Sequence, residues 1–299
     1  MITLKNVTKN YGTRIAINDV SLEVRKGEIF GLVGPDGAGK TTIIRMLTGL
    51  LSPTTGSLTV LGATNPEHIK EYLGYVPQKF SLYGDLTVME NIRLFGALYG
   101  QATELIDALA SRILGFTNLL PFKDRLADNL SGGMKQKLAL AAGLMHQPRL
   151  FFLDEPTTGV DPVSRREFWQ MLFKINKEGT SIFVSTPYMD EAEFCTRIAF
   201  VHNGCIVACD SPESLRQSYP YKVLELGTSD RNIKTHLANC SFLAINMFGD
   251  KYHLVVDDVT TAITQIQSVL TEMNIEITTL EEIQPTLEDV FVALAREEN

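Results

Sequence analysis

The sequence predicts an α/β fold with a mostly parallel sheet, followed by a small α+β domain. Continuous apolar runs at 29–33 and 150–153 are typical of strands that are buried on both faces of a parallel sheet. A glycine-rich loop joins the first of these runs to a helical segment, as in α/β units. Beyond residue 217 the segments are shorter and alternate between strand and helix patterns. We therefore expect one domain over 1–217 and a second over 218–299.

The elements of the first domain follow from the periodicity of its apolar residues. In chain order we expect half-buried strands at 2–4 and 20–24, a buried strand at 29–33, a helix over 40–50, helices between 85 and 145, a buried strand at 150–153, a helix after Pro162 and a buried strand at 181–185. The first helix should end where Gly49 and the turn at 53–56 interrupt it.

The second domain shows the order β-α-β-β-α-β. Its expected elements are a strand at 223–226, a short helix at 231–238, two strands around Gly249 and Asp250, a helix at 261–273, a strand at 275–279 and a last helix from Thr286. This order predicts a ferredoxin-like domain.

Composition excludes some functions. The chain has 299 residues and a formal charge of -8, which argues against nucleic acid as a partner because phosphate-backbone binding needs clustered Lys and Arg. It does not exclude a membrane protein as a partner. No apolar run approaches the ~18 residues of a spanning helix, and the N-terminus does not resemble a signal peptide. We expect a cytoplasmic protein, whose four cysteines are better interpreted as reduced thiols than as a metal site.

The loop after the first buried strand has the chemistry of a phosphate-binding loop. It fits the pattern G-x-x-x-x-G-K-[ST] between a strand and a helix, and the residues expected to contact the nucleotide are Gly34, Pro35, Asp36, Gly37, Ala38, Gly39, Lys40, Thr41 and Thr42. Glycines let backbone N–H groups curl round phosphates, and the helix N-terminus adds partial positive charge. Lys40 would reach the β- and γ-phosphates, and the Thr41 hydroxyl would ligate Mg²⁺.

Two carboxylates stand at the end of the second buried strand, where ligands bind in open α/β sheets. Asp154 would hold Mg²⁺ through water, and Glu155 would polarise the attacking water as a general base. The alternative is a solvated strand end without function.

A second site for an anion is expected at Ser131, Gly132 and Gly133. Ser131 is a good N-cap for the helix that follows, and the two glycines expose backbone N–H groups. On its own, this segment would be interpreted as an ordinary helix cap.

Together these motifs resemble the nucleotide-binding domain of ABC transporters. The motifs that occur in the family's order are the phosphate loop, Tyr75-Val76-Pro77 before Gln78, Leu130-Ser131-Gly132-Gly133 with Gln136, Leu153-Asp154-Glu155-Pro156 and Gly159-Val160-Asp161-Pro162. The resemblance covers residues 1 to about 217. It implies a P-loop NTPase fold of ABC type with an antiparallel N-terminal sheet and a helical subdomain at about 80–145.

The resemblance also implies partners and further residue roles. Two such domains would face head to tail, with each ATP between one phosphate loop and the other chain's Ser131 loop. The second ATPase chain is identical or different, and a separate transmembrane permease would hold the pair at the inner face of the cell membrane. Tyr11 resembles the aromatic that stacks on adenine, with a strand-end core residue as the alternative. Gln78 would sense Mg²⁺ and the γ-phosphate, and Asp161 would cross the dimer interface.

Two positions depart from the family pattern. Pro187 stands where a histidine is usual, and Asp36 stands where asparagine is common. Proline can neither donate to the γ-phosphate nor carry a proton, so hydrolysis is expected to be slow, with Thr186 or a water in the place of the histidine.

The segment from Pro285 to Phe291 resembles the tail of exporter-type ATPases, where it forms a regulatory or dimer-stabilising module. The alternative is an amphipathic helix that packs on its own domain. We therefore expect an ATPase subunit of an exporter. The alternatives are a soluble ABC-type ATPase and a weakly catalytic nucleotide-binding regulatory subunit.

Overall fold

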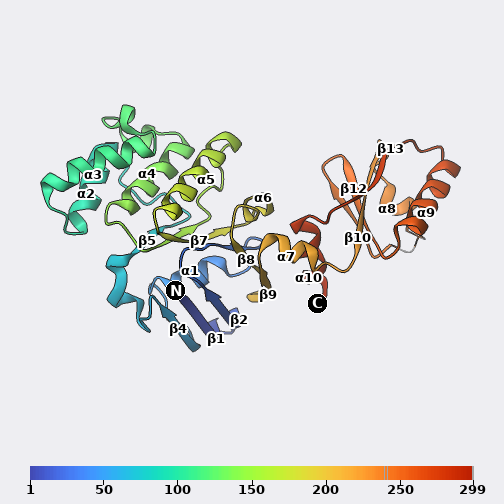
Figure 1. The fold of residues 1–299 in the computed structure, drawn as a ribbon, viewed down its shortest axis with the longest axis horizontal. Helices are drawn as coiled ribbons and strands as arrows, with labels where there is room; N and C mark the ends of the chain where they lie inside the picture. Colours follow the sequence, from blue (N-terminus) through green and yellow to red (C-terminus); the bar gives the residue numbers. More distant parts are fainter. Residues whose placement is uncertain (239, 241, 298–299) are drawn as a thin grey trace. The chain divides into compact units, whose positions relative to one another are not determined.

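The computed structural model describes residues 1–238, 240 and 242–297, and the chain separates into two compact units, Met1–Pro212 and Glu213–Asn299 (Figure 1). Helix α7 (Pro212–Gln217) begins at the division, so the boundary lies slightly before the expected one at 217. Each unit is described by itself.

The centre of the first unit is a six-stranded, mostly parallel sheet. Its strands, in spatial order, are β5 (Leu73–Val76), β6 (Leu150–Asp154), β7 (Ser181–Thr186), β3 (Ile29–Val33), β8 (Arg197–His202) and β9 (Cys205–Asp210). Only β9 pairs antiparallel within this sheet. Every residue of β3, β6 and β7 is buried, which explains their continuous apolar runs.

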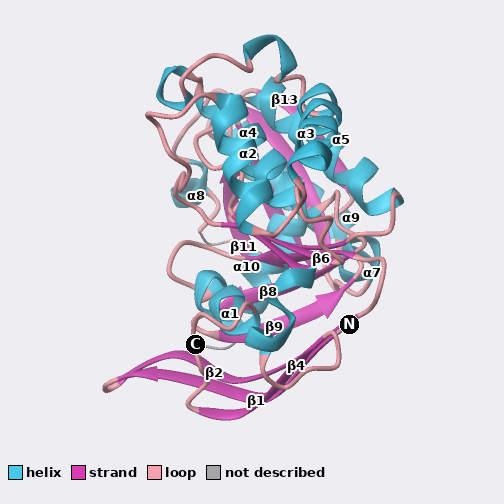
Figure 2. Cartoon of the chain, turned by 90° about the vertical axis from the view of Figure 1, so that its left-hand side faces the viewer, coloured by secondary structure: helices cyan, strands magenta, loops and turns pink. Residues whose placement is uncertain are grey.

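A three-stranded antiparallel sheet packs on the same core. It has the order β2 (Arg14–Val24), β1 (Ile2–Tyr11), β4 (Thr55–Val60). Helix α1 (Lys40–Leu47) contacts β2, β4 and β6, and its buried Ile43, Ile44 and Leu47 join the two sheets in one apolar cluster. Figure 2 shows α1 between this sheet and the rest of the unit. The packing fixes the start of α1, where the phosphate loop ends.

Helices α2 (Val88–Leu98), α3 (Thr103–Phe116) and α4 (Gly132–Leu144) form the expected helical subdomain with an apolar cluster of its own. Thr87 begins α2 with a capping box to Glu90. Helix α5 (Pro162–Lys177) contacts both α4 and β7, and the short α6 (Met189–Ala192) follows β7. No helix among the described residues is long and apolar enough to cross a membrane.

The second unit confirms the predicted ferredoxin-like topology. After α7 it contains β10 (Lys222–Thr228), α8 (Ile233–His236), β11 (Ala244–Phe248), β12 (Lys251–Val256), α9 (Val259–Glu272), β13 (Ile277–Ile283) and α10 (Leu287–Glu297). The sheet has the order β11-β12-β10-β13, and each neighbouring pair is antiparallel. The amphipathic α9 buries Ala262, Ile266 and Leu270 in the domain's core.

Some boundaries differ from the sequence predictions. β13 was expected to end at Thr279 but runs to Ile283, where Glu281 and Glu282 are tolerated because this strand lies at an edge of its sheet. Helix α1 ends at Leu47 instead of Leu50, since Gly49 adopts a φ of 77°. Strands β4, β5, β8 and β9 have no counterpart in the sequence predictions.

Candidate functional site

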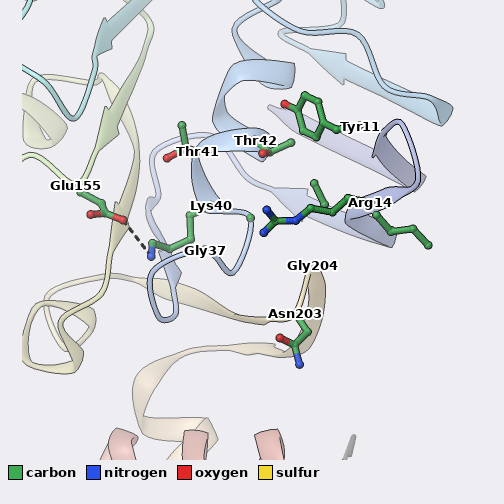
Figure 3. Close-up of a pocket in the computed structure, with 12 residues that line it drawn as sticks. Tyr11, Arg14, Gly37, Lys40, Thr41, Thr42, Glu155, Asn203 and Gly204 are labelled. Carbon is green, nitrogen blue, oxygen red and sulfur yellow. Dashed lines mark ion pairs between the residues drawn. The ribbon is translucent and has the colours of Figure 1, made fainter.

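The loop between β3 and α1 is shaped by glycines and opens on a pocket. Gly37 and Gly39 have φ values of 80° and 109°, a backbone region that residues with a side chain rarely adopt. The pocket has a volume of about 540 Å³, and its lining comes from the loop, the β1–β2 hairpin, the end of β6 and the β8–β9 turn (Figure 3). The lining residues are Tyr11, Arg14, Ile15, Ala16, Gly37, Gly39, Lys40, Thr41, Thr42, Glu155, Asn203 and Gly204. This volume is in the range of small-molecule sites.

Lys40 is buried in this loop and holds three oxygen partners. Its ammonium donates to the carbonyls of Gly34 at 2.7 Å and Pro35 at 2.9 Å, and lies 3.0 Å from Glu155 Oε1. A buried ammonium needs such partners because its desolvation is costly. A phosphate in the pocket would replace Glu155 as the anion beside Lys40.

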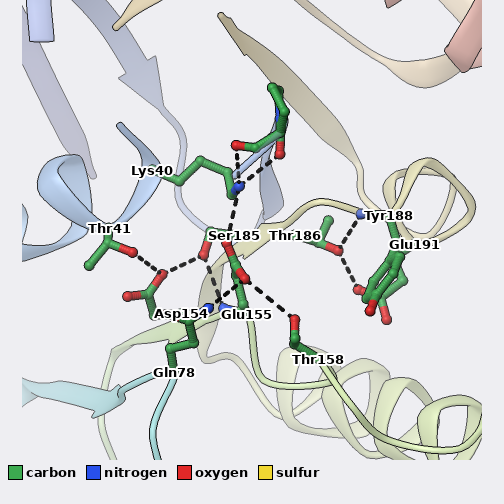
Figure 4. A network of polar contacts seen from close by, with 12 residues as sticks. Lys40, Thr41, Gln78, Asp154, Glu155, Thr158, Ser185, Thr186, Tyr188 and Glu191 are labelled. Carbon is green, nitrogen blue, oxygen red and sulfur yellow. Dashed lines mark hydrogen bonds and ion pairs between the residues drawn. The ribbon is translucent and has the colours of Figure 1, made fainter. Parts of the chain in front are cut away.

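The two carboxylates at the end of β6 have different surroundings (Figure 4). Asp154 Oδ1 accepts hydrogen bonds from the Ser185 hydroxyl at 2.7 Å and the Thr41 hydroxyl at 3.1 Å. Burial raises the pKa of Asp154 above its usual value, against the opposing effect of these two hydrogen bonds. Glu155 Oε2 accepts from the Gln78 amide at 2.8 Å. Gln78 follows β5, so three strand ends meet at this point.

The oxygen donors at Thr41 and Asp154 fit a hard divalent cation. A hydroxyl and a carboxylate within hydrogen-bonding distance of each other can both face one Mg²⁺ whose other ligands are water and phosphate oxygens.

Tyr11 and Arg14 lie on the β1–β2 hairpin and line the pocket. The Tyr11 side chain is 48% exposed, so the alternative of a strand-end core residue is wrong. In Figure 3 the Arg14 guanidinium points into the pocket, on the side of Lys40 and Thr42. The sequence analysis missed Arg14, Asn203 and Gly204, because these residues reach the pocket only through the hairpin and the antiparallel β8–β9 turn.

Ser131 and Asp161 begin helices outside the pocket lining. Ser131 Oγ accepts from Met134 N at 3.4 Å and caps α4, whereas Asp161 Oδ1 accepts from Val163 N and Ser164 N and caps α5. The backbone hydrogen bond from Ser164 holds the pKa of Asp161 below its usual value. The two helix starts are packed together, since a Cβ on Gly133 would lie 2.8 Å from Ser164 Cβ.

The geometry argues against Thr186 as the replacement for the missing histidine. Its hydroxyl donates to Glu191 Oε2 at 2.6 Å and accepts from Tyr188 N at 3.1 Å (Figure 4). Thr186 is completely buried and is not part of the pocket lining, and the only proton of its hydroxyl is already donated to Glu191.

The fold and this site define a P-loop nucleotide-binding protein. A family model described as "ABC transporter" matches residues 17–158, and one described as "ATP-binding protein DrrA1-3-like, C-terminal domain" matches residues 211–295. The chain is 34% identical over 302 residues to the Nod factor export ATP-binding protein I of Rhizobium leguminosarum bv. viciae, covering 99% of this chain and 95% of that protein. It therefore belongs to the ATP-binding proteins of ABC transporters, a family of ATPases.

A second relative matches a smaller share of the chain. The probable multidrug ABC transporter ATP-binding protein YbhF of Escherichia coli (strain K12) is 44% identical over 219 residues, which are 72% of this chain. The chain spans only 38% of the length of that relative. Among solved structures, the ATP-binding cassette MJ0796, a dimer in a post-hydrolysis state bound to ADP and Pi, has a TM-score of 0.66 at 28% identity and covers 71% of this chain and 98% of that chain.

Proposed function

We propose that the chain is the ATP-hydrolysing subunit of an exporter, and that it drives a separate transmembrane permease. The observation that carries this proposal is the meeting of Lys40, Thr41, Asp154, Glu155 and Gln78 at the carboxyl ends of neighbouring strands. The names of the relatives, a multidrug transporter protein and Nod factor export proteins, support export as the direction of transport.

In this proposal each residue at the phosphate loop has a defined task. Lys40 and the N-terminal amides of α1 bind the β- and γ-phosphates, and Tyr11 stacks on the base. Thr41 and Asp154 hold Mg²⁺, which neutralises charge on the phosphate oxygens. Glu155, released from Lys40 by the phosphate, accepts a proton from the attacking water while Gln78 fixes its second oxygen.

The proposed active form is a dimer, with an identical or a different ATPase chain. Ser131 and Asp161 lie outside the lining of this chain's pocket, at two packed helix starts. They would therefore serve the nucleotide of the second chain. MJ0796, with 28% sequence identity, forms a dimer with ADP and Pi bound, which supports this arrangement. The location that follows is the cytoplasmic side of a membrane, reached through the permease.

Steady-state phosphate release by the purified chain with Mg²⁺ and ATP tests the proposal, with Glu155→Gln as the matched variant. We expect activity in the wild type and its loss in the variant. Copurification of a membrane protein with the tagged chain distinguishes a transporter subunit from a soluble ABC-type ATPase. Nucleotide binding without turnover, even with the permease present, would instead identify a weakly catalytic regulatory subunit, the candidate that Pro187 favours.

A further inference from the structure

Glu191 is a completely buried carboxylate that lies outside the nucleotide pocket. Its oxygens accept hydrogen bonds from the Thr157 hydroxyl at 2.5 Å and the Thr186 hydroxyl at 2.6 Å, and Arg165 Nε lies 3.4 Å from Oε1. Burying a carboxylate is costly unless it is paired and hydrogen-bonded, and these three groups satisfy it. Replacing a buried ionic group of this kind by apolar side chains is often neutral or stabilising, so the presence of Glu191 points to a role beyond packing.

The three partners of Glu191 come from segments that surround the reaction site. Thr157 follows Glu155 by two residues, Thr186 is the last residue of β7, and Arg165 lies near the start of α5. Figure 4 shows Glu191 beside Thr186 and Tyr188, on the far side of Ser185 from Asp154. One carboxylate therefore joins the turn after β6 to the end of β7 and to the helix that Asp161 begins.

The turn after β6 needs such a support because Glu155 is strained. Its φ of 48° places a non-glycine residue in the left-handed region, at a cost of roughly 1–2 kcal/mol. Such a conformation persists only when its surroundings hold it. Ser185 holds the near side, since Glu155 N donates to its carbonyl and its hydroxyl. The far side is the turn at Thr157 and Thr158, and there Glu191 holds the Thr157 hydroxyl.

We propose that Glu191 is a positioning residue for Glu155, acting through the Thr157 hydroxyl. The proposal rests on the function given above, in which Glu155 accepts a proton from the attacking water. The Thr186 hydroxyl, which donates to Glu191, also accepts from Tyr188 N, so Glu191 is linked to the point where the chain leaves β7. Removing the Thr157–Glu191 contact should displace Glu155 by a fraction of an ångström without touching the groups that bind the phosphates.

Three variants separate positioning from structure. Thr157→Val keeps the shape and removes the hydroxyl, and we expect it to lower kcat by about tenfold or more, since small misplacements at a reacting centre are costly. Thr157→Ser restores the hydroxyl and should recover most of the turnover. Asp190→Asn removes an exposed carboxylate beside Glu191 that pairs with the same Arg165, and it should leave kcat unchanged. The Kd for ATP, measured by calorimetry, should stay within about twofold in all three, because Lys40 and α1 are untouched.

A double-mutant cycle with Glu191→Gln identifies the partner. If Thr157 and Glu191 act as one unit, the double variant should lose no more turnover than the worse single variant. If the losses of the two single variants multiply in the double variant, the inference is overturned and the proposed function is not. The same follows if the wild type is active and Thr157→Val keeps its full kcat. A rise in the Kd for ATP together with a fall in melting temperature, large enough to account for the loss of turnover, would also overturn the inference in favour of a structural role. A wild type that binds ATP but never hydrolyses it refutes the proposed function and removes the inference with it.

Discussion

Replacing Glu155 by glutamine should destabilise the nucleotide-free protein and strengthen its binding of ATP. In the structure Lys40 and Glu155 form a buried ion pair, with side chains 3% and 5% exposed. Removing one partner of a buried pair typically costs 3–5 kcal/mol. Here the remaining Lys40 ammonium keeps the carbonyls of Gly34 and Pro35, so we expect a loss of about 2 kcal/mol and a melting temperature lower by roughly 4–8 °C.

The same ion pair opposes ATP in the wild type. Binding must separate Lys40 from Glu155 and then place the γ-phosphate near a carboxylate of like charge. Glutamine removes both costs, so ATP should bind about tenfold more tightly to the variant, which corresponds to about 1.4 kcal/mol. The shift of the melting temperature by saturating ATP should therefore be larger in the variant than in the wild type.

Thermal unfolding and calorimetry with and without ATP test this reasoning, with Glu71→Gln, an exposed carboxylate on the same unit, as the control. Equal melting temperatures for the wild type and Glu155→Gln without nucleotide, together with equal Kd values, would show that the Lys40–Glu155 pair has no energetic weight. The position of Lys40 would then depend on the loop carbonyls alone.

Substitutions at four other positions test separate parts of the structure. Tyr11→Ala should weaken ATP binding about tenfold, whereas Tyr11→Phe should keep it. Arg14→Ala should weaken the binding of ADP more than the binding of adenosine if its guanidinium faces phosphate. Calorimetry measures both effects. Asp154→Asn should raise the melting temperature above pH 7, because a carboxyl whose pKa is raised by burial costs stability when it ionises, yet it should lower Mg²⁺-dependent phosphate release roughly 100-fold. Burial alone would raise the pKa of Asp289, but hydrogen bonds from His253 and Thr286 hold it below its usual 3.8. The stability that this carboxylate contributes should therefore be lost as the pH falls below 3.8, and Asp289→Asn should abolish that loss in melts between pH 5 and 3.

The sequence was sufficient for the parts of the fold that depend on local patterns. The runs that form β3, β6 and β7 are almost entirely apolar because both faces of these strands are buried. Such a run can be recognised from the sequence without an alternation of polar and apolar residues. The β-α-β-β-α-β order likewise predicted the second unit's topology. β9 escaped prediction because its residues are only partly buried, and its pairing with β8 depends on the tertiary sheet.

The candidate site shows the same division. Motif spacing placed Lys40, Thr41 and Glu155 together, since the first two follow the loop after β3 and Glu155 directly follows β6. Arg14 and Asn203 lie far apart in sequence and carry no motif, so only the folded hairpins bring them to the pocket. The burial of Glu191 could not be predicted from the sequence for a related reason. Glutamate is usually exposed, and nothing in the four-residue helix α6 indicates that this one is buried.

The effect of proline at position 187, where the family usually has a histidine, can be predicted from the structure. Pro187 directly follows β7, whose last residue, Thr186, accepts a hydrogen bond from Gly34 N of the phosphate loop through its backbone carbonyl. The hydroxyl of the preceding residue, Thr186, donates to Glu191. A hydrogen bond to a charged group is worth about 1.5–3 kcal/mol, so Pro187→His should raise kcat by tenfold or more if it supplies that bond in the transition state. Pro187→Ala, which frees the backbone without adding a donor, should not. An unchanged rate in a folded, nucleotide-binding Pro187→His protein would mean that a water already serves the γ-phosphate and that proline at this position does not slow hydrolysis.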